Sequence, residues 1–332
     1  MNVLSLFDGI SCGQLALQRA GVKVDKYFAS EIDKYAIEVT QENFPDTVQL
    51  GDVTKWETWE LPKIDLLIGG SPCQGFSFAG KQLNFSDPRS KLFFEYVKVL
   101  RKIKPKYFLL ENVKMKQEYQ DVISGHLGVE PIEINSSLVS AQDRKRLYWT
   151  NIPNVTQPED KGILLRDIVL EKSSEFSLEM VENYIVPFDK TLQIFDNELK
   201  RRKIACYGND GQGNRVYTIH GKSVTLCGEG GGRGAKTGLY LFGCITPDRI
   251  EKRQNGQRFS EGTKFYTLTA QDKHGVLIDG YIRKLTPLEC ERLQTVPDNY
   301  TSCISNSQRY KCLGNGWTVN VIAHILKGIS HD

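Results

Sequence analysis

The sequence has few features of a metal or disulfide site. Its 332 residues include eight cysteines and five histidines, yet no two cysteines form a C-x-x-C pair. The histidines do not cluster near the cysteines, so the spacing argues against zinc and we expect no metal. Disulfides are not expected in a reducing compartment.

Long apolar stretches are missing as well. No run approaches the ~18 residues that a membrane span needs, so we expect no membrane partner. The first residues, MNVLSLFDGIS, lack the basic n-region of a signal peptide, which predicts a cytoplasmic protein. A strong charge of either sign is absent too. The formal net charge of +3 permits a nucleic-acid partner without requiring one.

Apolar strand-like runs alternate with helical patterns through residues 1–158. The strand-like runs include 2–7, 24–32, 64–71 and 106–113, and the helical ones include 12–21, 33–44 and 89–103. Repeating strand–helix units predict an α/β fold with a doubly wound, mostly parallel sheet. Ligands of such sheets bind at the carboxyl ends of the strands.

The alternation stops after this first domain. Residues 159–282 carry many glycines and short β-type runs, which predict a smaller, largely β or irregular domain. Segments 223–241 and 265–278 share a Thr-Leu, turn, apolar pattern; a weak repeat and two unrelated hairpins explain it equally well. Helical patterns return in residues 283–332, and the last helix is expected to pack against the first domain.

The stretch LFDGISCG, residues 6–13, joins the first strand to the first helix. Gly9 and Gly13 allow a ligand to approach the backbone and the free N–H groups of the helix. Ser11 replaces the second glycine of the dinucleotide motif G-x-G-x-x-G, and the chain has no triphosphate-binding G-x-x-x-x-G-K-[ST]. Alone, such a turn fits a cofactor loop and an ordinary turn equally well.

Two carboxylates follow at the next strand ends. Glu31 stands where a carboxylate can accept hydrogen bonds from ribose hydroxyls, and Asp52 is within reach of an adenine amino group. Each alone is equally a solvated surface group. Together with the glycine-bearing turn, they indicate a cofactor pocket.

A lone thiol lies at the end of the fourth strand, in GGSPCQGFS (69–77). Cys73 is either a small buried residue near a turn or a nucleophile that a substrate can reach. Glu111 ends the next strand. Gln142, Arg144 and Arg146 share one face of an extended chain, where they could converge on an anion or a base. Taken alone, Glu111 could still be a solvated surface group, and the motif at 142–146 is better explained as a basic solvated strand edge.

One reaction uses all of these groups. A thiolate that adds to C6 of cytosine makes C5 nucleophilic, while a carboxyl group holds N3 and an arginine assists at O2. C5 then attacks an electrophilic methyl group, and loss of the C5 proton expels the thiol. The base must leave the helix to be reached.

The chain resembles the DNA (cytosine-5)-methyltransferases of bacterial and phage modification systems over almost its whole length. Nine family motifs occur in order: FDGISCG, SEID, GDV, GGSPCQGFS, RSKLFFEYVKVL, ENV, QDRKR, RKLTPLECERLQTVPD and LGNGWTVNVIAHI. The resemblance implies a Rossmann-like class I S-adenosylmethionine-dependent fold. It also implies methyl transfer to C5 of cytosine within a specific short double-stranded DNA sequence. Such an enzyme serves a restriction-modification system or acts as a phage anti-restriction methylase.

The resemblance also implies roles for the catalytic residues. Cys73 matches the nucleophile and Pro72 shapes its turn, while Glu111 matches the acid that holds N3. Arg144 and Arg146 match a motif in which one arginine is expected at a phosphate and the other at cytosine O2.

For S-adenosylmethionine, the implied binding residues lie at strand ends and near the C-terminus. They are Phe7, Gly9, Glu31, Ile32, Asp52, Pro72, Leu92 and Asn315. Phe7 is expected to stack on adenine, Leu92 to form an apolar wall, and Asn315 to contact the methionine end. Ser11 departs from the usual Phe-x-Gly-x-Gly motif. With Asp8, this variant is similar to the first motif of eukaryotic de novo enzymes.

For DNA, the resemblance implies a mobile loop at 74–91 and a target-recognition domain at 159–282. The expected contacts are Gln74, Ser77, Arg89, Arg215, Arg233 and Lys236, of which the last three are placed in the major groove. We expect a monomer in the bacterial cytoplasm, associated with the nucleoid through DNA. A cognate restriction endonuclease encoded nearby is a further partner to consider.

Three alternatives remain open. The same chemistry on RNA is disfavoured because the tRNA-directed relatives have a shorter recognition region. A catalytically silent DNA-binding module would be expected to have lost Cys73, Glu111 or Arg146. A cysteine-dependent hydrolase needs a histidine near Cys73, and the nearest in sequence, His126, has no supporting context.

Overall fold

The computed structural model describes the chain in three long stretches and several short ones. The long stretches are 1–71, 91–170 and 281–331, and the short ones are 177–180, 182–186, 192–194, 203–207, 215–219, 221–226 and 239–242. Some of the predicted site residues lie outside these ranges: Pro72, Cys73, Gln74, Ser77, Arg89, Arg233 and Lys236. Their roles stay predictions.

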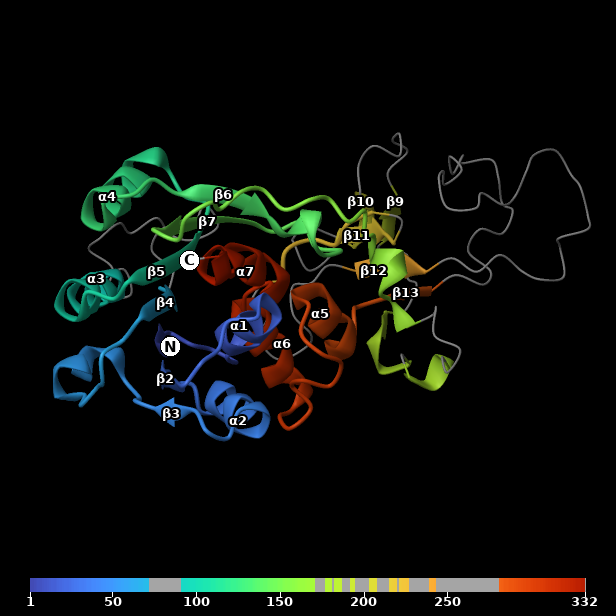
Figure 1. Cartoon of the computed structure of the whole chain (residues 1–332). Coiled ribbons are helices and arrows are strands. Elements are labelled where there is room, and N and C mark those ends of the chain that lie inside the picture. Colours follow the sequence, from blue (N-terminus) through green and yellow to red (C-terminus); the bar gives the residue numbers. More distant parts are fainter. Residues whose placement is uncertain are drawn as a thin grey trace, which may run out of the picture.

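Seven strands form the central sheet, in the order β3-β2-β1-β4-β5-β7-β6 (Figure 1). They are β1 (Asn2–Leu6), β2 (Lys26–Ser30), β3 (Val48–Gln49), β4 (Leu66–Gly70), β5 (Tyr107–Val113), β6 (Ile132–Asn135) and β7 (Lys145–Thr150). All neighbouring pairs from β3 to β5 are parallel, whereas β7 is antiparallel to both β5 and β6. The predicted mostly parallel sheet is confirmed.

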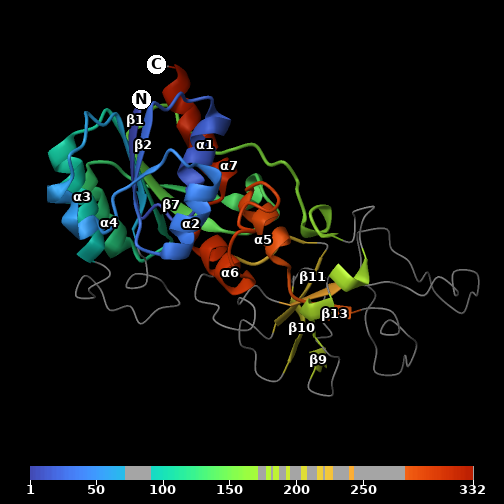
Figure 2. The same cartoon turned by 90° about the horizontal axis from the view of Figure 1, so that it is seen from below.

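Helices cover both faces of this sheet (Figure 2). The helices of the described chain are α1 (Cys12–Ala20), α2 (Lys34–Asn43), α3 (Lys91–Ile103), α4 (Gln117–Leu127), α5 (Pro287–Gln294), α6 (Asn306–Asn315) and α7 (Val319–Leu326), of which α5 and α6 lie towards the second sheet. Successive strand residues point to opposite faces, so Val3 packs in the core with α1 and α7, and Leu4 packs with α3 and α4. The helix α7 therefore packs with α1 in the core of the central sheet.

Short 3-10 turns complete the described elements. They are η1 (Val53–Thr58), η3 (Ser136–Leu138), η4 (Leu165–Asp167), η6 (Leu178–Met180), η7 (Glu182–Tyr184) and η10 (Lys327–His331). Within the described ranges, no helix combines the length and apolar character that a bilayer crossing demands.

Local sequence signals set several helix ends. The Asp33 side chain accepts a hydrogen bond from the backbone N–H of Tyr35 at 3.0 Å and begins α2. Gly21 ends α1 with φ of 74°, a left-handed conformation that glycine adopts without strain. Thr286 and Glu289 form a capping box at α5, with Pro287 in its first turn.

A second sheet of six short strands has the order β8-β13-β12-β11-β10-β9. They are β8 (Ile185–Val186), β9 (Leu192–Ile194), β10 (Lys203–Tyr207), β11 (Arg215–Thr218), β12 (Leu239–Phe242) and β13 (Tyr281–Arg283). This sheet lies to one side of the central sheet, beyond α5 (Figure 1). The domain boundary predicted between residues 282 and 283 falls inside β13.

A buried ion pair connects this second sheet to α5. Arg283 and Glu289 are both fully buried, and the two guanidinium nitrogens of Arg283 donate to the two carboxylate oxygens at 2.8 and 2.7 Å. Glu289 also accepts from the backbone N–H of Leu170 at 2.9 Å. Such bidentate geometry compensates the cost of burying both charges, so β13, α5 and the chain that enters the second domain are held together.

Candidate active site

The turn after β1 is bent by a series of left-handed residues. Phe7, Gly9 and Ser11 have φ of 59°, 61° and 56°. Non-glycine residues rarely adopt this conformation, so a turn with two of them is held by its surroundings. The Phe7 ring packs on the core beneath α3 and α4.

The Glu31 carboxylate is one of the groups that hold this turn. It accepts the backbone N–H of Gly9 at 2.8 Å on one oxygen, and those of Ile32 and Asp33 at 2.7 and 2.9 Å on the other. Glu31 therefore bridges the ends of β1 and β2. The neighbouring Ile32 side chain is 76% exposed, which leaves an apolar surface at the edge of the predicted cofactor pocket.

Asp8 belongs to the same turn, between Phe7 and Gly9. The hydroxyl groups of Tyr27 and Ser11 donate to its two carboxylate oxygens, the former at 2.7 Å. Burial nevertheless raises the pKa of Asp8 to about 6, because the surrounding protein removes water from the carboxylate. From the sequence, Asp8 was identified only as part of a variant of the first family motif, without a role of its own.

The remaining described cofactor candidates occupy three other elements. Asp52 caps η1 and accepts the backbone N–H of Thr54 at 2.9 Å; this hydrogen bond lowers the pKa of its carboxyl group. Leu92 is partly buried at the start of α3 and packs on the core. Asn315 is exposed at the end of α6.

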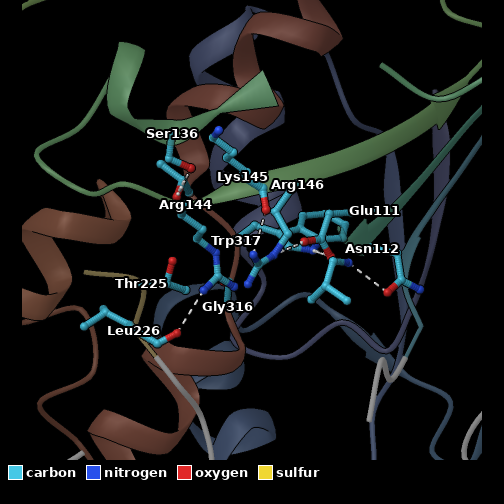
Figure 3. Close-up of polar contacts among 12 residues, drawn as sticks. Glu111, Asn112, Ser136, Arg144, Lys145, Arg146, Thr225, Leu226, Gly316 and Trp317 are labelled. Atoms are coloured by element: carbon cyan, nitrogen blue, oxygen red, sulfur yellow. Dashed lines mark hydrogen bonds and ion pairs between the residues drawn. The ribbon is translucent and has the colours of Figure 1, made fainter. Parts of the chain in front are cut away.

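Glu111 is the centre of the candidate catalytic site (Figure 3). It lies on β5 opposite Gly70, the last residue of β4, and is 8% exposed. Arg146 Nε lies 3.1 Å from Glu111 Oε1, and Trp317 Nε1 donates to Oε2 at 3.2 Å. The next residue, Asn112, donates to Ser71 Oγ at 3.1 Å and ties β5 to the chain that leads to Cys73.

Arg144 makes a different set of contacts from Arg146. It is 4% exposed, and its guanidinium donates to the backbone carbonyls of Leu226 at 3.0 Å, Gly314 at 3.3 Å and Gly316 at 3.1 Å. The two arginines thus approach the same region but bind different groups (Figure 3). Gln142 is fully buried, and its side-chain amide makes no hydrogen bond within the described structure.

Trp317 is the contact that the residues alone did not reveal. It follows the Gly-Asn-Gly turn in LGNGWTVN, a motif noted only as part of the family pattern. One signal was available: an indole N–H that is taken from water needs an acceptor, and carboxylates at strand ends are candidates.

Three buried thiols of the helices are poor nucleophiles. Burial raises the pKa of Cys12 to about 12 and that of Cys312 to about 12, and it raises the pKa of Cys290 well above its usual range. Because the thiolate is the reactive form, these three cysteines are unsuited to attack. The candidate nucleophile, Cys73, lies outside the described residues.

Two other predictions concern the periphery of the site. Arg215 begins β11 in the second sheet and is partly buried. His126, the histidine considered for a hydrolase, lies in the last turn of α4 with its Nδ1 3.2 Å from Arg101 of α3. It therefore does not lie at the carboxyl end of β5 where Glu111 stands.

The fold and the strand-end site define a class I methyltransferase architecture. Among solved structures, the chain is similar to Spodoptera frugiperda DNMT2, with a TM-score of 0.62 and 20% identity over 99% of both chains. It is also similar to a putative DNA modification methyltransferase encoded within an E. coli prophage, with a TM-score of 0.58 and 19% identity over 100% and 99% of the two chains.

The family model for C-5 cytosine-specific DNA methylases matches residues 1–121 and 136–331, and the chain belongs to this family. Orphan methyltransferase M.SPRI of Bacillus phage SPR is 31% identical over 100% of this chain and 98% of its own length. Type II methyltransferase M.HhaI of Haemophilus parahaemolyticus is 29% identical over 99% and 94%. The expected activity, DNA (cytosine-5-)-methyltransferase (EC 2.1.1.37), is confirmed.

Proposed function

We propose that the enzyme methylates C5 of a cytosine flipped out of double-stranded DNA, with S-adenosylmethionine as the donor and Cys73 as the nucleophile. The observation that carries this proposal is the position of Glu111. Its carboxylate is held by Arg146 and Trp317 at the end of β5, next to the strand that leads into the Cys73 segment.

In the proposed reaction, the Cys73 thiolate adds to C6 of the cytosine. The electron pair of the C5–C6 bond becomes available at C5, and Glu111 hydrogen-bonds to N3 while Arg146 faces O2. C5 takes up the methyl group that S-adenosylmethionine would supply; the S–CH3 bond breaks and its electron pair stays on sulfur, so the donor would leave as the neutral thioether S-adenosylhomocysteine. Removal of the C5 proton by a base then restores the double bond and expels the thiolate, so that atoms and charge balance.

The described residues fit S-adenosylmethionine. When bound, this cofactor supplies an electrophilic methyl group on a sulfonium. Glu31 and Asp52 place carboxylates at the ends of β2 and β3 for ribose hydroxyls and the adenine amino group, and Ile32 offers an exposed apolar surface. Phe7, Gly9 and Leu92 would border the adenine side, and Asn315 the methionine end.

DNA recognition is assigned to the second domain and to the loop at 74–91. Gln74, Ser77 and Arg89 would contact the flipped site, while Arg215, Arg233 and Lys236 would reach the major groove. We assign the enzyme to a restriction-modification system or to phage anti-restriction, acting as a monomer in the bacterial cytoplasm. A cognate endonuclease is a partner in the first case.

Bisulfite sequencing of DNA from cells that express the protein tests activity, base and sequence context together. We expect 5-methylcytosine at one short recurring sequence. A labelled-methyl assay on duplex DNA and tRNA separates the RNA alternative. DNA that contains 5-fluorocytosine at the target should form a denaturant-stable adduct, because fluorine blocks the final elimination. Methylation of an exocyclic nitrogen would contradict the mechanism.

A further inference from the structure

The two oxygens of the Glu111 carboxylate are held by donors from different parts of the chain. Arg146, on β7, lies 3.1 Å from Oε1, and Trp317, between α6 and α7, donates to Oε2 at 3.2 Å. With Glu111 itself 8% exposed, this pair of contacts limits how the carboxyl plane can turn (Figure 3).

Trp317 is itself fixed on both sides along the chain. The carbonyl of Gly316 accepts hydrogen bonds from Arg144 at 3.1 Å and from Gln294 Nε2 at 3.2 Å. On the other side, Thr318 Oγ1 donates to Gln294 Oε1 at 2.9 Å. Gln294 is fully buried and Arg144 nearly so. The backbone that carries the indole is therefore held by two buried side chains.

The end of β4 also fits closely against this contact. A Cβ atom added at Gly70 would lie 2.9 Å from Trp317 Nε1 and 3.1 Å from Glu111 Oε2. A Cβ atom at Gly13, in the first turn of α1, would lie 3.7 Å from the Trp317 ring. The indole thus lies between the cofactor turn and the carboxylate, and only a hydrogen at Gly70 leaves room for the pair.

The indole can act in this contact only as the hydrogen-bond donor. Its N–H is a donor only, so it can bind a carboxyl oxygen but cannot exchange roles with it as a hydroxyl could. An oxygen held in this way is not free to rotate toward the substrate. Oε1, which lies beside Arg146, is then the oxygen that would meet the substrate.

We propose that Trp317 is a positioning residue for Glu111: its indole N–H fixes the carboxyl group in the orientation that meets cytosine, and Arg144 supports the turn that carries the indole. This inference rests on the proposed role of Glu111 at N3. It also assigns Arg144 to the support of Trp317 and leaves Arg146 as the arginine that faces the base.

Nuclear magnetic resonance of the indole N–H groups tests the contact without any activity. The chain has four tryptophans, and the signal missing in Trp317→Phe identifies that of Trp317. Glu111→Ala should move this signal more than any other indole signal. Glu95→Ala is the matched control, because Trp56 Nε1 donates to Glu95 at 3.1 Å and its signal should move instead. An unmoved Trp317 signal in Glu111→Ala would overturn the inference.

Kinetics test the consequence. Trp317→Phe keeps an aromatic ring but removes the N–H donor, and we expect kcat to fall about tenfold while KM for S-adenosylmethionine and DNA changes by less than about twofold. Trp149→Phe is the control: its indole donates to Ser124 at 3.0 Å in the core, so it should lower thermal stability but not kcat.

The outcomes separate this inference from the proposed function. An unchanged kcat in Trp317→Phe, or a rise only in KM for S-adenosylmethionine, overturns the positioning role. In either case, 5-methylcytosine formation by the wild type still supports the proposed function. If the wild type methylates no DNA, the proposed function fails, whereas the indole signals still decide whether Trp317 holds Glu111.

Discussion

In the seven-stranded sheet, the charged groups of the candidate site lie at strand ends. In the junction to the second sheet (residues 137–144, 163–170, 222–226 and 283–294), several charged groups are instead bound by other groups of the protein. Arg144 and Lys222 each bind three backbone carbonyls, and Arg283 binds Glu289. Charged side chains therefore serve different purposes in the two regions: at the strand ends they are placed for a ligand, and in the junction they bind other groups of the protein.

The difference follows from how the two regions are built. Parallel strands with continuous apolar runs are buried on both faces and stable from their own packing, so their ends are left for polar groups that a ligand can meet. The short strands of the second sheet offer less apolar area. Hydrogen bonds from buried cations to carbonyls satisfy polar backbone that would otherwise be unpaired. Substitutions at strand ends should thus change activity, and those in the junction should change stability.

The largest expected effect is on activity alone. Cys73→Ser should lower methyl transfer by at least about 10³-fold, because a hydroxyl is a far weaker nucleophile than a thiolate at neutral pH. Labelled-methyl transfer measures this, and gel-shift titration should show largely intact duplex binding. Cys303→Ser, at an exposed cysteine, is the control and should retain activity. If Cys73→Ser and the wild type turned over at the same rate, Cys73 would not be the nucleophile.

The next effect is on stability alone. Glu289→Gln removes the carboxylate charge that the fully buried Arg283 binds through two hydrogen bonds, so the free energy of unfolding should fall by about 3–5 kcal/mol. Urea denaturation measures the change. Asp298→Asn breaks the partly exposed Arg292–Asp298 pair and should cost only about 0–1 kcal/mol. If both variants cost the same, the junction pair has no special role.

The contrast between the regions also explains what the sequence could predict. Short apolar runs located β1, β4 and β5, and a carboxylate after an apolar run marked Glu31 and Glu111, because these signals are local. Periodicity and turn residues carry this information within a few positions. The antiparallel insertion of β7 between β5 and β6 depends on chain order in space and had no such signal.

Contacts between segments that are far apart in the chain could not be predicted from local sequence signals. Trp317 and Glu111 are 206 positions apart, and the carbonyls that Arg144 binds are 82 to 172 positions away. An arginine in an alternating run looks the same whether it faces DNA or backbone carbonyls. Only the tertiary structure places Leu226 and Gly316 around the Arg144 guanidinium.

A smaller effect tests the second cation of the junction. Lys222 Nζ donates to the carbonyls of Ser137 at 2.7 Å and Ser140 at 3.1 Å, and to that of Ile163. Lys222→Met leaves carbonyls unsatisfied, so the free energy of unfolding should fall by about 1–3 kcal/mol while kcat is kept. Lys161→Met, at an exposed site, should change it by less than about 0.5 kcal/mol. A loss of kcat at unchanged stability would place Lys222 with the site residues.

Asp8 tests the comparison between strand ends and junction most severely. It belongs to the strand-end site, yet its carboxyl group is desolvated like the charged groups of the junction. Its pKa is raised from 3.8 to about 6 in the folded protein. The protonated form is thus favoured by folding, and this stabilisation is present below pH ~4 and lost as the pH rises through about 6. Asp8→Asn cannot ionise, so its stability relative to wild type should improve by about 1–2 kcal/mol between pH 4 and 7.

Urea denaturation across this pH range measures the Asp8 effect, and Asp52 provides a control of opposite sign. The Asp52 carboxyl has a lowered pKa, so its stabilisation is present above the unfolded value and lost as the pH falls. Asp52→Asn should therefore lose stability relative to wild type at neutral pH and recover it in acid. Parallel pH profiles for the two variants would mean that burial does not distinguish Asp8 from the solvated carboxylates at the other strand ends.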